Sequence, residues 1–155
     1  DKALAALKEN DFFIAIGDNA VREKIFRKLA EKNLHPVNAI HPSAVIDPSA
    51  NLAPNGIMVA ANAVINPLAK IGVGAICNTS CIIEHECIVG DFAHIGPGAV
   101  LCGNVKVGNN TFVGANAVVR QGITIGNNAM IGAGAVVVKN VADNTTVTGV
   151  PAHTK

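Results

Sequence analysis

Residues 95–119, IGPGAVLCGNVKVGNNTFVGANAVV, carry an aliphatic side chain at every sixth position. The spacing continues in both directions, with one extra residue after Leu52, and every position in the series is aliphatic or Cys. These anchor positions are Ile40, Ile46, Leu52, Val59, Ile65, Ile71, Cys77, Ile83, Val89, Ile95, Leu101, Val107, Val113, Val119, Ile125, Ile131 and Val137. A fixed period of six residues indicates a β-solenoid.

Each six-residue unit also carries its own turn signal. Asn or Gly, which tolerate positive φ, stands three residues after most anchors, at 55, 62, 74, 98, 104, 110, 116, 122, 128, 134 and 140. The position after that is small or β-branched, most often Ala. Three consecutive units, each a short strand and a corner, close one triangular coil. The sequence therefore predicts a mainly β fold, with about 5.7 coils of parallel β-helix around a thin aliphatic core.

The composition narrows the function classes. The chain has 155 residues, 50% of them hydrophobic and 15% charged, and all five aromatic residues are Phe. No apolar run approaches the roughly 18 residues needed to span a bilayer. A net charge of +1 offers no basic field for nucleic acid. A chain with so many hydrophobic and so few charged residues should expose apolar surface, and we expect this surface to be buried between subunits.

The four cysteines, Cys77, Cys81, Cys87 and Cys102, form no C-x-x-C pair. We expect buried free thiols rather than zinc ligands or a disulfide framework. Free thiols favour a reducing, cytoplasmic location. The chain begins at Asp1 and not at Met, so we expect further sequence upstream.

Residues 1–38 hold most of the charge and predict a partial α/β subdomain, followed by the β-helix domain at 39–155. We expect helices at 2–9 and 20–33 and strands at 11–16 and 37–40, with residues 17–19 capping the second helix. That helix places Val21, Ile25, Phe26 and Leu29 on one face and its Arg, Lys and Glu residues on the other. So small a unit cannot bury a core of its own.

One unit of the repeat, residues 83–88, departs from the pattern. It holds Glu84, His85 and Glu86, and Glu86 stands where most units use Asn or Gly. Such departures from local consistency tend to mark functional sites. Equivalent positions of successive coils stack, so His85 lies above Pro67 and below Gly103, beside an open volume and a backbone N–H. A base next to such a donor suits acyl transfer. From the residues alone, a solvated His flanked by carboxylates is the alternative interpretation of His85, and a hydrogen-bonded structural residue is the default for His94.

The repeat resembles the left-handed β-helix of hexapeptide acyltransferases over residues 40–155, and that family is an exception to the right-handed crossover rule. Within it, residues 78–95, NTSCIIEHECIVGDFAHI, are similar to the catalytic stretch of bacterial sugar-nucleotide N-acetyltransferases. The nearest members acetylate UDP-linked 4-amino-4,6-dideoxy sugars in bacillosamine synthesis, for glycan precursors. Sialic acid O-acetyltransferases are related.

The resemblance implies roles for individual residues. His85 is the general base and Glu86 orients it, while His94 contacts the thioester region of acetyl-CoA. Backbone at Gly103, Ala115 and Ala133 lines the coenzyme groove. In the front segment, which resembles the end of a Rossmann-like sugar-nucleotide domain, Gly17 contacts the substrate. Family members are homotrimers with the groove between neighbouring prisms, and they use no metal.

Three hypotheses compete with N-acetylation of a nucleotide-linked amino sugar. O-acetylation of a sialic-acid-like sugar uses the same base and groove. A γ-type carbonic anhydrase needs three His around zinc, and the body of the helix offers His85 and His94 with no H-x-x-x-x-H pair. A non-catalytic solenoid scaffold accounts for the fold but leaves the Glu-His-Glu unit unexplained.

Overall fold

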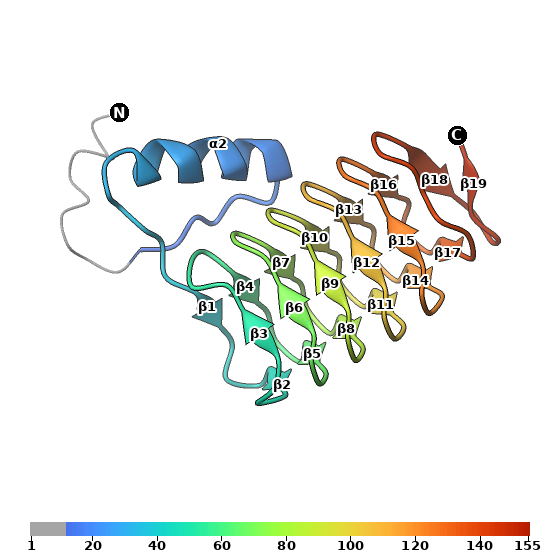
Figure 1. The fold of residues 1–155 in the computed structure, drawn as a ribbon, viewed down its shortest axis with the longest axis horizontal. Helices are drawn as coiled ribbons and strands as arrows, with labels where there is room; N and C mark the ends of the chain where they lie inside the picture. The colour runs from blue at the N-terminus through green and yellow to red at the C-terminus, as the bar shows by residue number, and fades with distance from the viewer. Residues whose placement is uncertain (1–11) are drawn as a thin grey trace.

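A computed structural model describes residues 12–155 as a triangular prism of β coils with one helix along an edge (Figure 1). Sheet A contains β1 (Ala39–Ile40), β4 (Met58–Val59), β7 (Ile76–Cys77), β10 (His94–Ile95), β13 (Phe112–Val113), β16 (Met130–Ile131), β18 (Thr146–Thr148) and β19 (His153–Thr154). Sheet B contains β2 (Val45–Ile46), β5 (Val64–Ile65), β8 (Ile82–Ile83), β11 (Val100–Leu101), β14 (Val118–Val119) and β17 (Val136–Val137). Sheet C contains β3 (Asn51–Leu52), β6 (Lys70–Ile71), β9 (Ile88–Val89), β12 (Lys106–Val107) and β15 (Thr124–Ile125).

The strand register confirms that three units make one coil. Ile82 pairs with Val100, and Val100 pairs with Val118, all in parallel. Among the described strands, only the last pair, β18 with β19, is antiparallel, and it covers the C-terminal end of the solenoid in Figure 1. We call the turns between the sheets corner AB (such as 78–81), corner BC (such as 84–87) and corner CA (such as 90–93).

The predicted core is confirmed from the second coil onward. Every anchor from Val59 to Val137 is at most 2% exposed. In the first coil, Ile40 is 48% exposed, while Ile46 and Leu52 are partly buried. Nothing stacks beneath this coil among the described residues, so its aliphatic side chains pack on one side only.

The corners use left-handed backbone as the turn signals predict. From Asn62 to Gly134, the residue three positions after each anchor has positive φ, even where it is Leu, Ser, Glu or Phe. Two predicted corners differ. In the corner after Leu52, which holds the extra residue, Gly56 has positive φ and Asn55 does not. In the last predicted corner, Asn140 does not have positive φ. Its side chain instead accepts a hydrogen bond from the Thr124 N–H at 2.9 Å.

The front segment departs most from the sequence prediction. Residues 12–18 form no strand, because one backbone hydrogen bond, from Val37 N–H to the Phe12 carbonyl at 2.9 Å, does not continue into a ladder. The strand expected at 37–40 shortens to β1 and joins sheet A. The helix expected at 2–9 lies outside the described residues. The second helix is confirmed as α2 (Asn19–Ala30), with Asp18 as its N-cap accepting from Val21 N–H at 2.8 Å.

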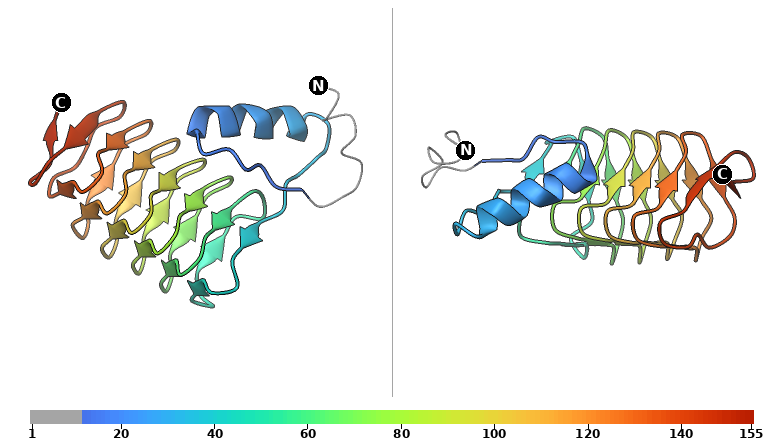
Figure 2. Two further views of the ribbon diagram at one scale, coloured as in Figure 1. Left: turned by 180° about the vertical axis from the view of Figure 1, so that it is seen from behind. Right: turned by 90° about the horizontal axis from the view of Figure 1, so that it is seen from above.

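Helix α2 runs along corner CA, over residues 56, 74, 92 and 110 of successive coils (Figures 1 and 2). The rings of Phe26 and Phe92 meet edge to face with centroids 5.3 Å apart. Gly74 makes room for them, because a Cβ there would lie 2.5 Å from the Phe92 ring. The predicted helix face is partly wrong: Val21 is 46% exposed, whereas Arg22, assigned to the polar face, is buried.

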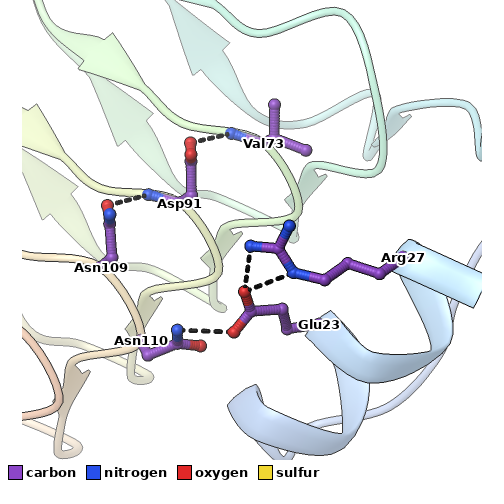
Figure 3. A network of polar contacts seen from close by, with 6 residues as sticks. All are labelled: Glu23, Arg27, Val73, Asp91, Asn109 and Asn110. Atoms are coloured by element: carbon purple, nitrogen blue, oxygen red, sulfur yellow. Dashed lines mark hydrogen bonds and ion pairs between the residues drawn. The ribbon is translucent and has the colours of Figure 1, made fainter. Parts of the chain in front are cut away.

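Polar side chains reinforce the same corner as a ladder (Figure 3). The Oδ1 atom of Asp91 accepts from Val73 N–H at 2.9 Å, and Asn109 does the same for Asp91 N–H. Asn127 and Asp143 continue the ladder through the following coils. Each coil thus satisfies a backbone donor of the coil before it, which fixes the surface on which α2 packs.

Candidate active site

Corner BC of the third coil presents His85 and Glu86 together. The imidazole Nδ1 lies 3.2 Å from Glu86 Oε2, and both side chains are 58% exposed. A carboxylate can only accept, so Nδ1 carries the proton in the neutral ring and Nε2 keeps its lone pair. The pair therefore offers an oriented, accessible base at Nε2.

Gly103 lies directly above that base, as the stacking of successive coils predicts. The Asn104 N–H donates to the His85 carbonyl at 2.8 Å, and the Glu86 N–H donates to the Pro67 carbonyl at 3.0 Å. A Cβ at Gly103 would lie 2.5 Å from His85 Nε2, so only glycine leaves the imidazole in this position. The Gly103 N–H donates no hydrogen bond to residues 12–155, which leaves a donor free beside Nε2.

Glu86 occupies its corner at a conformational cost. Its φ is 60°, a left-handed value that costs a non-glycine residue roughly 1–2 kcal/mol. Asn or Gly fills most of the other corners, but Leu68, Ser80 and Phe92 adopt the same conformation, so strain alone does not distinguish Glu86. Its contact with His85 does.

His94 lies elsewhere, on the outer face of sheet A under the start of α2, and is 9% exposed. The Asn78 Oδ1 atom accepts from Thr79 N–H at 2.7 Å, which turns the Asn78 amide nitrogen towards His94 Nε2 at 3.0 Å. Nε2 therefore accepts and Nδ1 carries the proton. Nδ1 is buried, with no well-formed hydrogen bond among the described residues.

The surroundings of His94 keep it neutral. Burial lowers the pKa of His94, the Arg22 guanidinium lowers this pKa further, and the nearby Gly17 carbonyl opposes the shift. The ring also stands edge to face with Phe112, with centroids 4.9 Å apart. His94 thus offers an N–H donor rather than a charge.

A cavity of about 540 Å³ joins His94 to Gly17. Its walls are the loop before α2 and the outer faces of β10, β13 and β16, and it is lined by Gly17, Asp18, Asn19, Ala20, His94, Asn110, Phe112, Asn128, Ala129 and Met130. Phe112 and Met130 take the place of His94 in the next two coils, so stacking alone could have found them. Nothing in the sequence pattern pointed to Asn110.

The remaining predicted residues, Ala115 and Ala133, stack at corner AB, where the Gly134 N–H donates to the Ala115 carbonyl at 2.8 Å. The predicted residues thus fall into three groups. His85, Glu86 and Gly103 meet at corner BC, His94 and Gly17 meet at sheet A, and the two alanines lie at corner AB. Because corner BC lies opposite sheet A in a triangular coil, one chain cannot bring His85 and His94 together.

Within residues 12–155, no cluster of three or more His, Cys, Asp or Glu side chains could hold a metal ion. The four thiols are free; Cys77, Cys81 and Cys87 are buried as predicted, whereas Cys102 is only partly buried. Burial raises the pKa of the Cys87 thiol to about 11. A protonated thiol is a poor nucleophile, so Cys87 does not suit an acetyl-enzyme intermediate. In the same range, no helix is both long and apolar enough to cross a membrane.

Comparisons with known proteins agree with this arrangement. The family model for the bacterial transferase hexapeptide (six repeats) matches residues 104–139, and that for the PglD N-terminal domain matches residues 1–29. PerB from Caulobacter crescentus, solved with CoA and GDP-perosamine, is 44% identical with a TM-score of 0.96 over 100% of this chain and 76% of its own.

Two further structures extend the likeness. The acetyltransferase domain of PglB from Neisseria gonorrhoeae, solved with acetyl coenzyme A, is 36% identical, with a TM-score of 0.95 over 99% of this chain and 76% of its own. WeeI from Acinetobacter baumannii is 28% identical, with a TM-score of 0.89 over 96% of this chain and 74% of its own. The chain therefore belongs to the hexapeptide-repeat sugar-nucleotide N-acetyltransferases and is an acetyl-CoA-dependent enzyme.

Proposed function

We propose that this enzyme transfers the acetyl group of acetyl-CoA directly to the amine of a nucleotide-linked amino sugar, with His85 as the general base. The observation that carries the proposal is the free Nε2 of His85, held by Glu86 at Nδ1 and lying against Gly103. Direct transfer needs no nucleophile from the protein, which agrees with the protonated state of the Cys87 thiol.

The reaction follows from this geometry. The amine nitrogen attacks the thioester carbon while its proton passes to His85 Nε2. Glu86 stabilises the imidazolium that forms, and the free N–H of Gly103 donates to the developing oxyanion. The C–S bond then breaks, the thiolate of CoA leaves, and the imidazolium returns the proton to it.

The coenzyme side of the proposal uses His94, Gly103, Ala115 and Ala133. We expect His94 to contact the thioester region of acetyl-CoA with the part of its ring that lines the cavity, because Nδ1 is buried near the Gly17 carbonyl. The two alanines expose backbone at corner AB to the pantetheine arm. Since these groups lie on different sides of one prism, a neighbouring copy has to complete the groove.

The outer surface of sheet B supports a homotrimer. Its outward column consists of Val45, Val64, Ile82, Val100, Val118 and Val136, which stack in register without one polar residue. The outward column of sheet C instead includes Asn51, Lys70, Lys106 and Thr124. An unbroken aliphatic face beside corner BC suits burial against a second copy, and threefold closure joins corner BC to the neighbour's sheet A.

For the acceptor, we propose a 4-amino-4,6-dideoxy sugar linked to a nucleotide, in the synthesis of a glycan precursor in the cytoplasm. UDP is the nucleotide that the bacillosamine resemblance favours, and GDP is the one in the PerB structure. Gly17 contacts this substrate from residues 1–38, the sugar-nucleotide part of the chain, and residues 39–155 form the acetyltransferase part.

The test incubates the full-length enzyme with acetyl-CoA and UDP-, GDP- or dTDP-linked amino sugars. We expect one panel member to gain an acetyl group on nitrogen, with equal release of free CoA thiol. Acetyl transfer only to hydroxyls of a sialic-acid-like sugar, or to no sugar at all, contradicts the proposal.

A further inference from the structure

Among residues 12–155, Arg22 is the most deeply buried charged side chain that the proposed reaction does not use. It is 1% exposed, and its guanidinium makes five hydrogen bonds. The acceptors are the carbonyls of Gly74 (2.8 Å), Ile16 (3.1 Å), Gly17 (3.0 Å) and Phe92 (2.7 Å) and the side-chain oxygen of Asn19 (3.0 Å).

Hydrogen bonds, and not an ion pair, hold the Arg22 guanidinium within residues 12–155. Among the described residues, no carboxylate forms an ion pair with Arg22. Burial lowers the pKa of Arg22 to about 10, with the charge of Asp18 opposing the shift, so the group stays charged at neutral pH. A buried charge without an ionic partner is costly, so the five hydrogen bonds of Arg22 must compensate for its loss of hydration.

The acceptors belong to two separate parts of the molecule. Ile16 and Gly17 belong to the loop before α2 and Asn19 is the first residue of the helix; we call residues 16–19 together the Gly17 loop. Gly74 and Phe92 belong to corner CA of two successive coils, and Phe92 precedes His94 by two residues. The planar fork of Arg22 therefore fixes the Gly17 loop against corner CA, and Phe92 of this corner leads directly into β10 and His94.

The Gly17 loop lines one side of the cavity of about 540 Å³, and His94, which follows corner CA in the chain, lines the side formed by sheet A. We propose that Arg22 is a positioning residue for the acceptor substrate, because it sets the distance between the Gly17 loop and His94 across this cavity. The inference rests on the proposed function for the identity of the ligand. A lysine cannot replace Arg22 here, since one ammonium cannot reach acceptors on both sides of a planar fork.

The kinetic test compares Arg22→Lys and Arg22→Met with Lys24→Met, which removes an exposed cation from the same helix. For both Arg22 variants we expect the KM for the amino-sugar nucleotide to rise roughly tenfold or more, because small misplacements of a binding wall weaken orientation strongly. The KM for acetyl-CoA should stay within about twofold, and Lys24→Met should change neither constant.

The inference is overturned if folded Arg22→Lys keeps its KM for the sugar nucleotide within about twofold of wild type. It is also overturned if both KM values rise together with a fall in melting temperature, since that result describes a purely structural role.

Hydrogen exchange without substrates separates this inference from the proposed function. The peptide covering residues 16–22 should exchange faster in Arg22→Lys than in wild type, while peptides from the solenoid stay unchanged. Equal exchange overturns the inference whatever the acceptor is. If neither variant folds, the exchange of residues 16–22 is measured in the wild-type enzyme. Rapid exchange there overturns the inference, and protection like that of the rest of α2 supports it. Failure of wild type to acetylate any sugar nucleotide overturns the proposed function alone.

Discussion

At the scale of single residues, His85 has one ring nitrogen held by Glu86 and the other accessible beside Gly103. We predict that His85→Ala lowers kcat by on the order of 10² to 10⁴, with the affinity for acetyl-CoA nearly unchanged. The exposed corner does not support the core, so the melting temperature should stay the same. A folded variant with more than about a third of wild-type kcat contradicts the base assignment.

Glu86 links catalysis to backbone strain. Because φ is 60° at this residue, Glu86→Gly should stabilise the fold by about 1 kcal/mol while lowering kcat, through loss of the partner of His85. Ser80→Gly is the control, since it relieves the same kind of corner (φ 56°) in the same coil and should stabilise without changing kcat. Thermal unfolding and steady-state kinetics measure both. Unchanged kcat in Glu86→Gly rules out an orienting role.

His94 makes the stability depend on pH. Its folded-state pKa lies below the ordinary 6.5, so the unfolded chain binds more protons just below that pH. The stability from neutral His94 is complete above about pH 6.5 and is lost as the pH falls towards the lowered pKa. Between about pH 7.5 and 5.5, wild type should therefore lose more unfolding free energy in urea than His94→Gln. Equal losses contradict a lowered pKa.

The residues of corner BC were predictable because the stacking of successive coils is a property of the sequence itself. The repeat alone places Gly103 above His85, and the same rule reaches Phe112 and Met130 from His94. Arg22 was not predictable, because it lies on a helix whose contacts depend on how two distant segments pack. Its polar side chain matched the solvent face of the helix in pattern, and only the backbone carbonyls around it make burial favourable.

At the scale of elements, the period of six residues determines the strands, corners and core, since each unit pairs with a copy of itself one coil away. The front segment has no such repetition. The apolar run at 11–16 has the composition of a strand, yet residues 12–16 lack a strand to pair with among the described residues. Composition therefore predicted the type of segment there but not its partner.

Sheet B gives a prediction at this scale. Ile82→Lys places a charge in the aliphatic outer column and should yield a monomer without activity. The control is Ile88→Lys, the equivalent change on sheet C, where Lys70 and Lys106 already flank the position. That variant should remain an active trimer. Light scattering and acetyl transfer measure both, and a trimeric, active Ile82→Lys enzyme excludes sheet B as the interface.

At the scale of the whole molecule, the residues of the proposed site lie apart in one chain. His85 lies at corner BC and His94 lies against sheet A, on the far side of the same prism. The central claim is that one copy supplies His85 and its neighbour supplies His94 to each acetyl-transfer site. Homotrimers of either single variant then contain no intact site, whereas mixed trimers contain some.

Complementation between His85→Ala and His94→Ala tests this most directly. The two inactive variants are unfolded together, refolded as an equal mixture and assayed for acetyl transfer. With random assembly, about a quarter of the interfaces join an intact His85 to an intact His94, so activity should return to about a quarter of wild type. A mixture that forms trimers yet stays as inactive as the separate variants contradicts the shared site, because it means that both residues must come from one chain.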